Sequence, residues 1–239
     1  MRTASLRFVA MAALALAAAA PASAAQQKVP FVGCAGKGIA DLSAAPTGGP
    51  KAVAVAAATA SPLAYYQSAE GLGALAPKGW KCFSFSGTSG ASLVIAATED
   101  PSAAFDAPLT GNAVVLTNYV GDTSGRFAVA QYAARLFPQV EKSFIARVIA
   151  EGIEPKESFP FGPYPADKLT YKTQRLVEFV TPANSDGLGD SSLLAKNASP
   201  ISGMAKIVDS ADGPQFYLLT VRLPADQAAL AAAIVEAGE

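Results

Sequence analysis

The sequence has no histidine, only two cysteines and one tryptophan among its 239 residues. Ser-His-Asp and Cys-His catalysis and histidine metal sites all need an imidazole, so these classes are excluded. Two thiols are too few for a disulfide-rich miniprotein or a four-thiolate zinc site. With 18 basic and 19 acidic side chains, the chain lacks the positive excess of a dedicated nucleic-acid binder. Hydrophobic residues make up 51% of the sequence, which is ample material for a buried core.

The N-terminus has the pattern of a secretory signal. Arg2 and Arg7 precede an apolar run of 13 residues at 8–20, and the small residues of a cleavage site follow at 21–24 (Pro-Ala-Ser-Ala). A membrane-spanning helix needs about 20 residues, so a permanent anchor is the weaker interpretation, and no transmembrane anchor is expected after cleavage. We therefore expect residues 1–24 to be a signal peptide and the mature protein to be periplasmic or secreted in a bacterium.

That compartment favours pairing of the two cysteines. An oxidising environment joins a small, even number of thiols more often than it leaves them free, so the sequence predicts a disulfide between Cys34 and Cys82. The closed loop of about 49 residues is expected to contribute about 4 kcal/mol on chain-entropy grounds. Residues 31–34 (Phe-Val-Gly-Cys) also look like a lipoprotein lipobox. Polar residues separate them from the apolar run, so lipidation of Cys34 is the less favoured alternative.

The mature chain is predicted to be one α+β unit. An extended lead-in over residues 25–50 is followed by a single domain over residues 51–239. The Ala- and Leu-rich segment that begins at Ser61-Pro62 is interpreted as a helix, since serine caps helices and proline is favoured in the first turn. The other expected elements are hairpins at 81–95 and 200–223, a strand at 113–120, a helix at 124–136, a segment of ambiguous period at 144–153, a strand-like segment at 169–181 and a final helix at 224–237.

This order of elements indicates the arrangement of the layers. Two hairpins, further strands and three or more helices imply a mostly antiparallel sheet with the helices packed on one side. The Pro- and Gly-rich loop at 154–166 is not interpreted as a domain boundary, because each half alone would have few elements with which to cover a sheet.

Several short motifs carry a family resemblance. Residues 75–82 read Leu-Ala-Pro-Lys-Gly-Trp-Lys-Cys. Three further motifs contribute to the same resemblance, at 63–66, 122–127 and 177–182. With these motifs, most of the mature chain resembles a group of uncharacterised exported bacterial proteins, in which histidine usually stands where this chain has Lys81. The resemblance brings no reaction, ligand or cofactor with it. The Pro-x-Gly-Trp step into a strand is also similar to PsbP-like domains, which are α+β accessory modules, as an architectural analogy.

Two functions of different classes fit these observations. The favoured one is a non-enzymatic accessory or ligand-binding protein that needs no cofactor or metal and whose partner is a small molecule or another envelope protein. Its candidate ligand groove is formed by Tyr65, Tyr66 and Trp80, although a single tryptophan is more often a core residue. The alternative is a small periplasmic hydrolase that uses a Ser/Lys dyad or paired carboxylates. The candidate carboxylates are Glu99, Asp100, Glu178 and Asp190.

Overall fold

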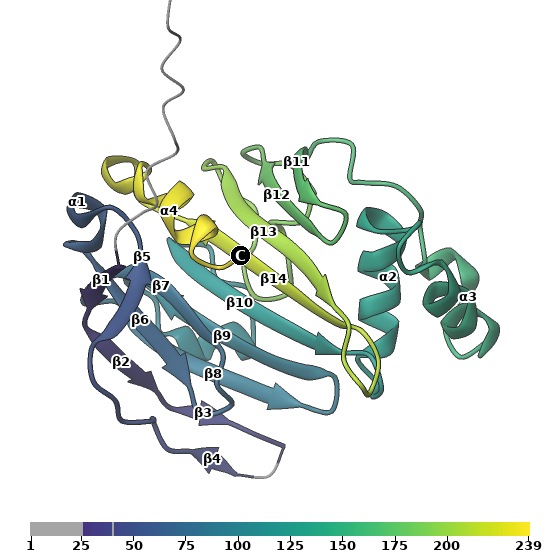
Figure 1. The fold of residues 1–239 in the computed structure, drawn as a ribbon, viewed down its shortest axis with the longest axis horizontal. Helices are drawn as coiled ribbons and strands as arrows, with labels where there is room; N and C mark the ends of the chain where they lie inside the picture. The colour runs from purple at the N-terminus through teal and green to yellow at the C-terminus, as the bar shows by residue number, and fades with distance from the viewer. Residues whose placement is uncertain (1–25, 40) are drawn as a thin grey trace, which may run out of the picture.

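The computed structural model describes residues 26–39 and 41–239, so the predicted signal peptide lies outside the described residues. These residues form a nine-stranded sheet, a three-stranded sheet and a two-stranded ribbon, together with helices α1 to α4 (Figure 1). In spatial order, the large sheet contains β11 Lys168–Thr173, β12 Leu176–Thr181, β13 Ile201–Val208, β14 Gln215–Arg222, β10 Ala113–Val120, β9 Gly90–Ala96, β8 Lys81–Gly87, β3 Gly36–Lys37 and β4 Leu42–Ser43.

The other elements surround this sheet. The three-stranded sheet contains β2 Phe31–Cys34, β6 Leu63–Ser68 and β7 Gly73–Pro77, and the ribbon pairs β1 Gln26–Val29 with β5 Lys51–Ala54. The helices are α1 Ala57–Ala60, α2 Arg126–Leu136, α3 Lys142–Ala150 and α4 Leu230–Glu236, with 3-10 turns η1 Pro101–Phe105, η2 Lys156–Ser158 and η3 Ala225–Gln227. No helix in the described part of the chain is long and apolar enough to cross a membrane.

The α+β class is confirmed, but the predicted mostly antiparallel sheet is corrected to mixed sheets. The predicted hairpins form as β8–β9 and β13–β14, and β10 lies between them, paired with β9 and β14. Parallel pairing occurs where β3 joins β8 in the large sheet and where β2 joins β6 in the small one. These parallel strands come from the lead-in, whose short segments cannot form hairpins with the later strands that they join.

The prediction that helices pack on one side is also wrong, because helices cover both faces of the large sheet. Val129 and Ala133 of α2 pack with Phe216 on what we call the α2 face. Ile234 of α4 packs with Leu219 on the opposite face, which we call the α4 face. Successive residues of a strand point to opposite faces, so β14 supplies both cores alternately.

The segment after Ser61-Pro62 is a strand, not the predicted helix. The only helical turn there is α1, which ends at Ala60, and Leu63–Ser68 forms β6 between β2 and β7. Leu63 and Tyr66 are fully buried in the core beneath this small sheet. Helix propensity is a weak preference, and the burial and pairing of these side chains override it.

Cys34 and Cys82 form the predicted disulfide, with their Cα atoms 5.4 Å apart. The bond joins β2 of the small sheet to β8 of the large sheet, so it links the lead-in to the rest of the fold. Cys34 is 1% exposed and belongs to the same core cluster as Leu63, so the lead-in is part of the core. No thiol is left at Cys34 for the alternative lipidation.

A fully buried arginine holds the loops at the other end of the α2 face. Arg222 donates its Nε to the Gly111 carbonyl at 2.8 Å and its Nη1 to the Ala195 carbonyl at 2.5 Å. Its Nη2 donates to the carbonyls of Leu109 and Gly111. These bonds join the loop before β10 and the loop before β13 to the end of β14, and burial lowers the pKa of this guanidinium.

Candidate functional site

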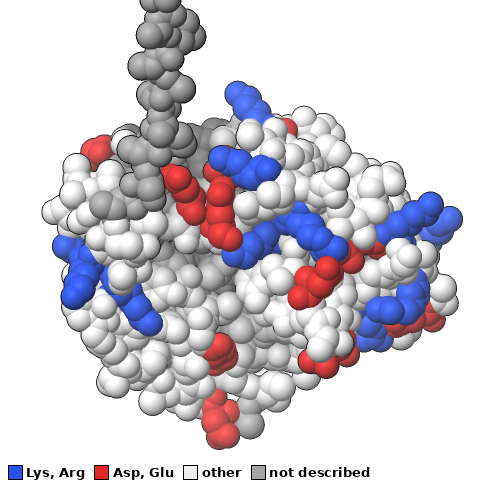
Figure 2. All heavy atoms as spheres, viewed as in Figure 1, with Lys and Arg blue, Asp and Glu red and all other residues white. Residues whose placement is uncertain are grey.

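A cleft of about 920 Å³ lies on the α4 face, between the two sheets. Its floor is formed by β10, β14 and β13, one wall by β5 and β7, and the other by the end of α4. Figure 2 shows acidic and basic side chains gathered near the end of α4 on this face. Clefts of about 300–1,000 Å³ are typical of small-molecule sites, so this is the candidate functional site.

Because of the register of the three floor strands, the side chains that line the floor form two parallel rows. Asn118, Tyr217 and Lys206 are directly opposite one another on β10, β14 and β13. Two residues further along each strand, the matching row is Leu116, Leu219 and Met204. All six residues line the cleft. We call these the polar row and the apolar row; they lie about 7 Å apart, the length of two strand residues.

The polar row offers hydrogen-bond donors. The Asn118 amide nitrogen, Nδ2, is buried and has no hydrogen-bond partner among the described residues. Lys206 Nζ donates to the main-chain oxygens of Gly238 at 2.8 Å and Glu239 at 2.9 Å, which leaves one of its three N–H donors free of these bonds. Burial lowers the pKa of Lys206, and the nearby negative charge of Glu239 opposes that shift. Tyr217 lies between the two and donates its hydroxyl to Gln215 Oε1 at 2.8 Å.

The apolar part of the cleft is closed by side chains from both walls. Ile234 of α4 and Leu75 of β7 line it and are both buried. Tyr65 of β6 lies directly against Gly73 of β7, where a Cβ would come within 1.9 Å of the Tyr65 hydroxyl. Only glycine allows this close approach, so Gly73 keeps the Tyr65 ring at the cleft wall. Burial raises the pKa of Tyr65, which therefore stays neutral at physiological pH.

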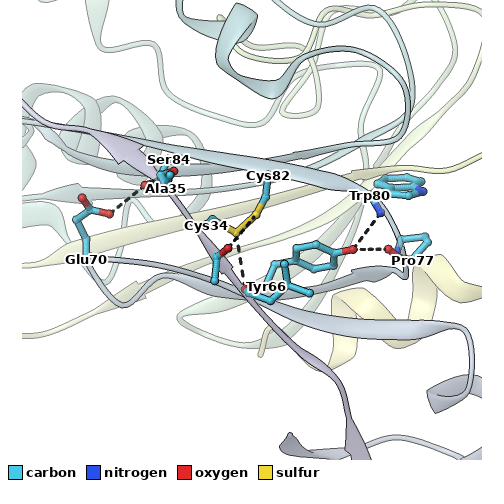
Figure 3. Close-up of a disulfide and its surroundings, with 10 residues drawn as sticks. Cys34, Ala35, Tyr66, Glu70, Pro77, Trp80, Cys82 and Ser84 are labelled. Atoms are coloured by element: carbon cyan, nitrogen blue, oxygen red, sulfur yellow. Dashed lines mark hydrogen bonds between the residues drawn. A yellow bond between two sulfur atoms is a disulfide. The ribbon is translucent and has the colours of Figure 1, made fainter. Parts of the chain in front are cut away.

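The three predicted groove residues are not brought into one groove. Tyr65 lines the cleft, whereas Tyr66 is fully buried beneath the small sheet. Figure 3 shows the Tyr66 hydroxyl between Pro77 and Trp80; it donates to the Pro77 carbonyl at 2.7 Å and accepts from the Trp80 backbone N–H at 3.2 Å. Trp80 is partly buried against the core cluster that contains Cys34. Tyr66 and Trp80 thus fix the turn between β7 and β8.

Three of the four candidate carboxylates hold loops in place. Glu99 accepts the Gly111 N–H at 2.5 Å, Asp100 accepts the Ser102 N–H at 3.0 Å at the start of η1, and Asp190 accepts the Lys196 N–H at 2.9 Å. These bonds order the loops around β10 and β13 and place none of the three acids in the cleft.

Glu178, the fourth candidate, lies outside the cleft in a shallower groove between β12 and α4. It forms an ion pair of 3.1 Å with Lys172 and hydrogen-bonds with Glu239. Burial, followed by this contact, raises the pKa of Glu239. No hydrogen bond joins a serine to a lysine within residues 26–39 and 41–239.

The polar row was not identified from the sequence, although a signal for it exists. Asn118 interrupts the apolar run Ala-Val-Val-Leu-Thr in β10, and Lys206 interrupts the apolar end of β13. Both would stand out as polar residues in buried strands, where an unpaired polar group is costly. The residues are 88 positions apart, so only the strand order of the folded sheet brings them together.

Comparison with protein-family models, with curated proteins and with solved structures finds no match to this chain. The functional argument therefore depends on the geometry of the cleft.

Proposed function

We propose that this chain is an exported, non-enzymatic protein that binds a small molecule in the cleft between α4, β7 and the large sheet. The observation that supports this most is the buried amide nitrogen of Asn118, which lies on the cleft floor without a hydrogen-bond partner in the described part of the chain. Such an unsatisfied donor costs about 1–3 kcal/mol. The nitrogen is closed off from solvent, so a ligand acceptor reaches it once the Asn118 side chain rotates toward the cleft. That bond removes the cost, which favours the liganded state.

Two further observations support export to the periplasm or beyond. The N-terminal residues have the order of a secretory signal, and the two cysteines form a disulfide. Disulfides persist in oxidising compartments and are rare in the cytosol. A ligand-binding protein of the envelope therefore fits both the chemistry of the cleft and the chemistry of the cysteines.

Native mass spectrometry of the full chain, expressed with its N-terminal segment in a bacterium and purified from the periplasm and the medium, tests this function. The variant Ala54→Trp is designed to block the cleft. It places an indole at an exposed residue on the rim of the cleft. Ala107→Trp is the matched control, since Ala107 is equally exposed but lies outside the cleft. We expect a retained ligand mass on the wild type and on the control, and its loss from Ala54→Trp.

The same measurement reports export, because cleavage after Ala24 shortens the chain by 24 residues. The proposal is overturned if the wild-type protein carries no added mass and a library of metabolites leaves its melting temperature unchanged. It is equally overturned if a retained ligand remains on Ala54→Trp at the wild-type level, since the ligand then lies elsewhere.

A further inference from the structure

We infer that the cleft selects an anionic amphiphile: a carboxylate that binds the polar row and a short apolar body that lies on the apolar row. This inference rests on the proposed function and names its ligand class. It follows from the juxtaposition of donors and aliphatic side chains in adjacent rows of one floor.

The polar row offers hydrogen-bond donors that suit a ligand acceptor. Asn118 and Lys206 are both donors, and they lie on either side of Tyr217, two strand spacings or about 10 Å apart at the backbone. The Lys206 ammonium lies over the Tyr217 ring, with Nζ 5.6 Å from its centroid. A carboxylate has two acceptor oxygens, so it can receive the Asn118 amide and the remaining Lys206 N–H together.

The charge on Lys206 favours an anion over a neutral acceptor. Lys206 is half-buried and lies near the negative charge of Glu239. Its ammonium bonds to the main-chain oxygens of Gly238 and Glu239 but to no side-chain carboxylate in the described part of the chain. A partly desolvated ammonium attracts an opposite charge more strongly than an exposed one does. A carboxylate in the polar row therefore gains both hydrogen bonds and charge neutralisation.

Acidic residues around the cleft do not reverse this preference. The side chains of Glu236 and Glu239 are exposed at the end of α4, where water and salt weaken the effect of their charge, although the Glu239 charge still acts on Lys206. Glu70 lines the cleft, and its carboxylate accepts a hydrogen bond from the Ser84 hydroxyl at 3.3 Å (Figure 3). Lys206 is the cationic side chain among the residues that line the cleft, and it lies on the floor in the polar row.

The apolar row limits the length of the ligand body. Leu116, Leu219 and Met204 line the cleft, but the next residues along the same face, Val114 and Val221, do not. The apolar floor thus extends one row beyond the polar row, a step of about 7 Å. Such a floor suits a short alkyl chain or a single ring, with Ile234 packing over it from α4.

Isothermal titration with three probes of equal chain length tests this selection: sodium octanoate, 1-octanol and octylamine, each added to the full-length mature protein after removal of any retained ligand. We expect octanoate to bind at least about 10-fold more tightly than either of the others, since hydrogen bonds to charged groups account for about 10- to 100-fold in affinity.

Four variants test which side chains are responsible for the preference for octanoate. Lys206→Met and Asn118→Leu should each weaken octanoate binding by about 10-fold or more, while Lys206→Arg, which keeps the charge, should retain most of it. Lys142→Met is the matched control, because Lys142 is exposed at the start of α3 on the opposite face. Circular dichroism and melting temperatures of each variant show whether it is folded, and only folded variants are compared.

Preferential binding of octylamine, or equal binding of all three probes with no effect of Lys206→Met on a folded protein, overturns the inference. Either result leaves the proposed function in place, because the cleft then binds a small molecule but does not prefer an anion. The proposed function fails separately if none of the probes binds and the purified protein carries no ligand.

Discussion

Removing the disulfide measures how much the lead-in contributes to the stability of the fold. In a Cys34→Ala/Cys82→Ala double variant the covalent link between β2 and β8 is lost, while the residues around it stay apolar. The half-cystines are 48 positions apart in the chain. Closing a loop of this size destabilises the unfolded chain by about 4 kcal/mol. We therefore expect the free energy of unfolding of the variant to be lower than that of the wild type by about this amount. For a protein of this size, such a loss lowers the melting temperature by about 8–16 °C.

Urea denaturation followed by tryptophan fluorescence is the assay, since Trp80 lies next to the small sheet. The small sheet keeps its apolar contacts through Leu63, Tyr66 and Leu75, so the native state should remain intact. The midpoint should therefore fall, while the slope of free energy against urea should not decrease, because the unlinked unfolded chain exposes at least as much surface as the linked one. Wild-type protein reduced under native conditions is the control and should match the variant.

Two results would refute this reasoning. A loss below about 1 kcal/mol would mean that the loop is already restricted in the unfolded chain, against the chain-entropy argument. A reduced slope would mean that the small sheet detaches from the native variant, so that the disulfide, and not the core contacts, holds the two sheets together.

Two further predictions concern single side chains. Tyr66→Phe removes a buried hydroxyl that bonds to the Pro77 carbonyl and the Trp80 N–H, so urea denaturation should show a loss of about 1–3 kcal/mol; an unchanged midpoint contradicts the role given to this hydroxyl. Burial raises the pKa of Glu239 above its unfolded value, so its contribution to stability is full below the unfolded pKa and is lost as the pH rises through the folded pKa. Glu239→Gln should therefore flatten the fall in stability as the pH rises above the unfolded pKa of a glutamate, and denaturation curves that show the wild-type dependence would contradict this assignment.

The strands of the large sheet were largely predictable because their side chains alternate or form compact apolar runs. The Gly-Thr-Ser-Gly turn between β8 and β9 limits the pairing to one hairpin, and β10 occupies the expected residues 113–120. The helix over 124–136 was predictable from the spacing of its apolar residues, and α2 begins at Arg126. Local patterns of this kind need no knowledge of distant partners.

The small sheet and the cleft were not predictable, for a related reason. Tyr65 and Tyr66 lie in a segment whose alanine and leucine content favours a helix, and only pairing with β2 and β7 makes it a strand. The polar row likewise depends on the registers of two strand pairs, β10–β14 and β13–β14. Register follows from the complete sheet, so neither Asn118 nor Lys206 could be assigned to the site from its neighbours in the sequence.

The position of Arg222 constrains when the protein can fold during biosynthesis. Its partners Gly111 and Ala195 are 111 and 27 residues earlier in the chain, and β14 itself separates β10 from β13 at the centre of the large sheet. Until β14 has been synthesised, β10 has an open edge and the loop before it lacks the hydrogen bonds from Arg222. The large sheet is therefore completed only after β14 has been made. A chain truncated before β14 should aggregate through the open edge of β10, even though about nine tenths of its residues are present.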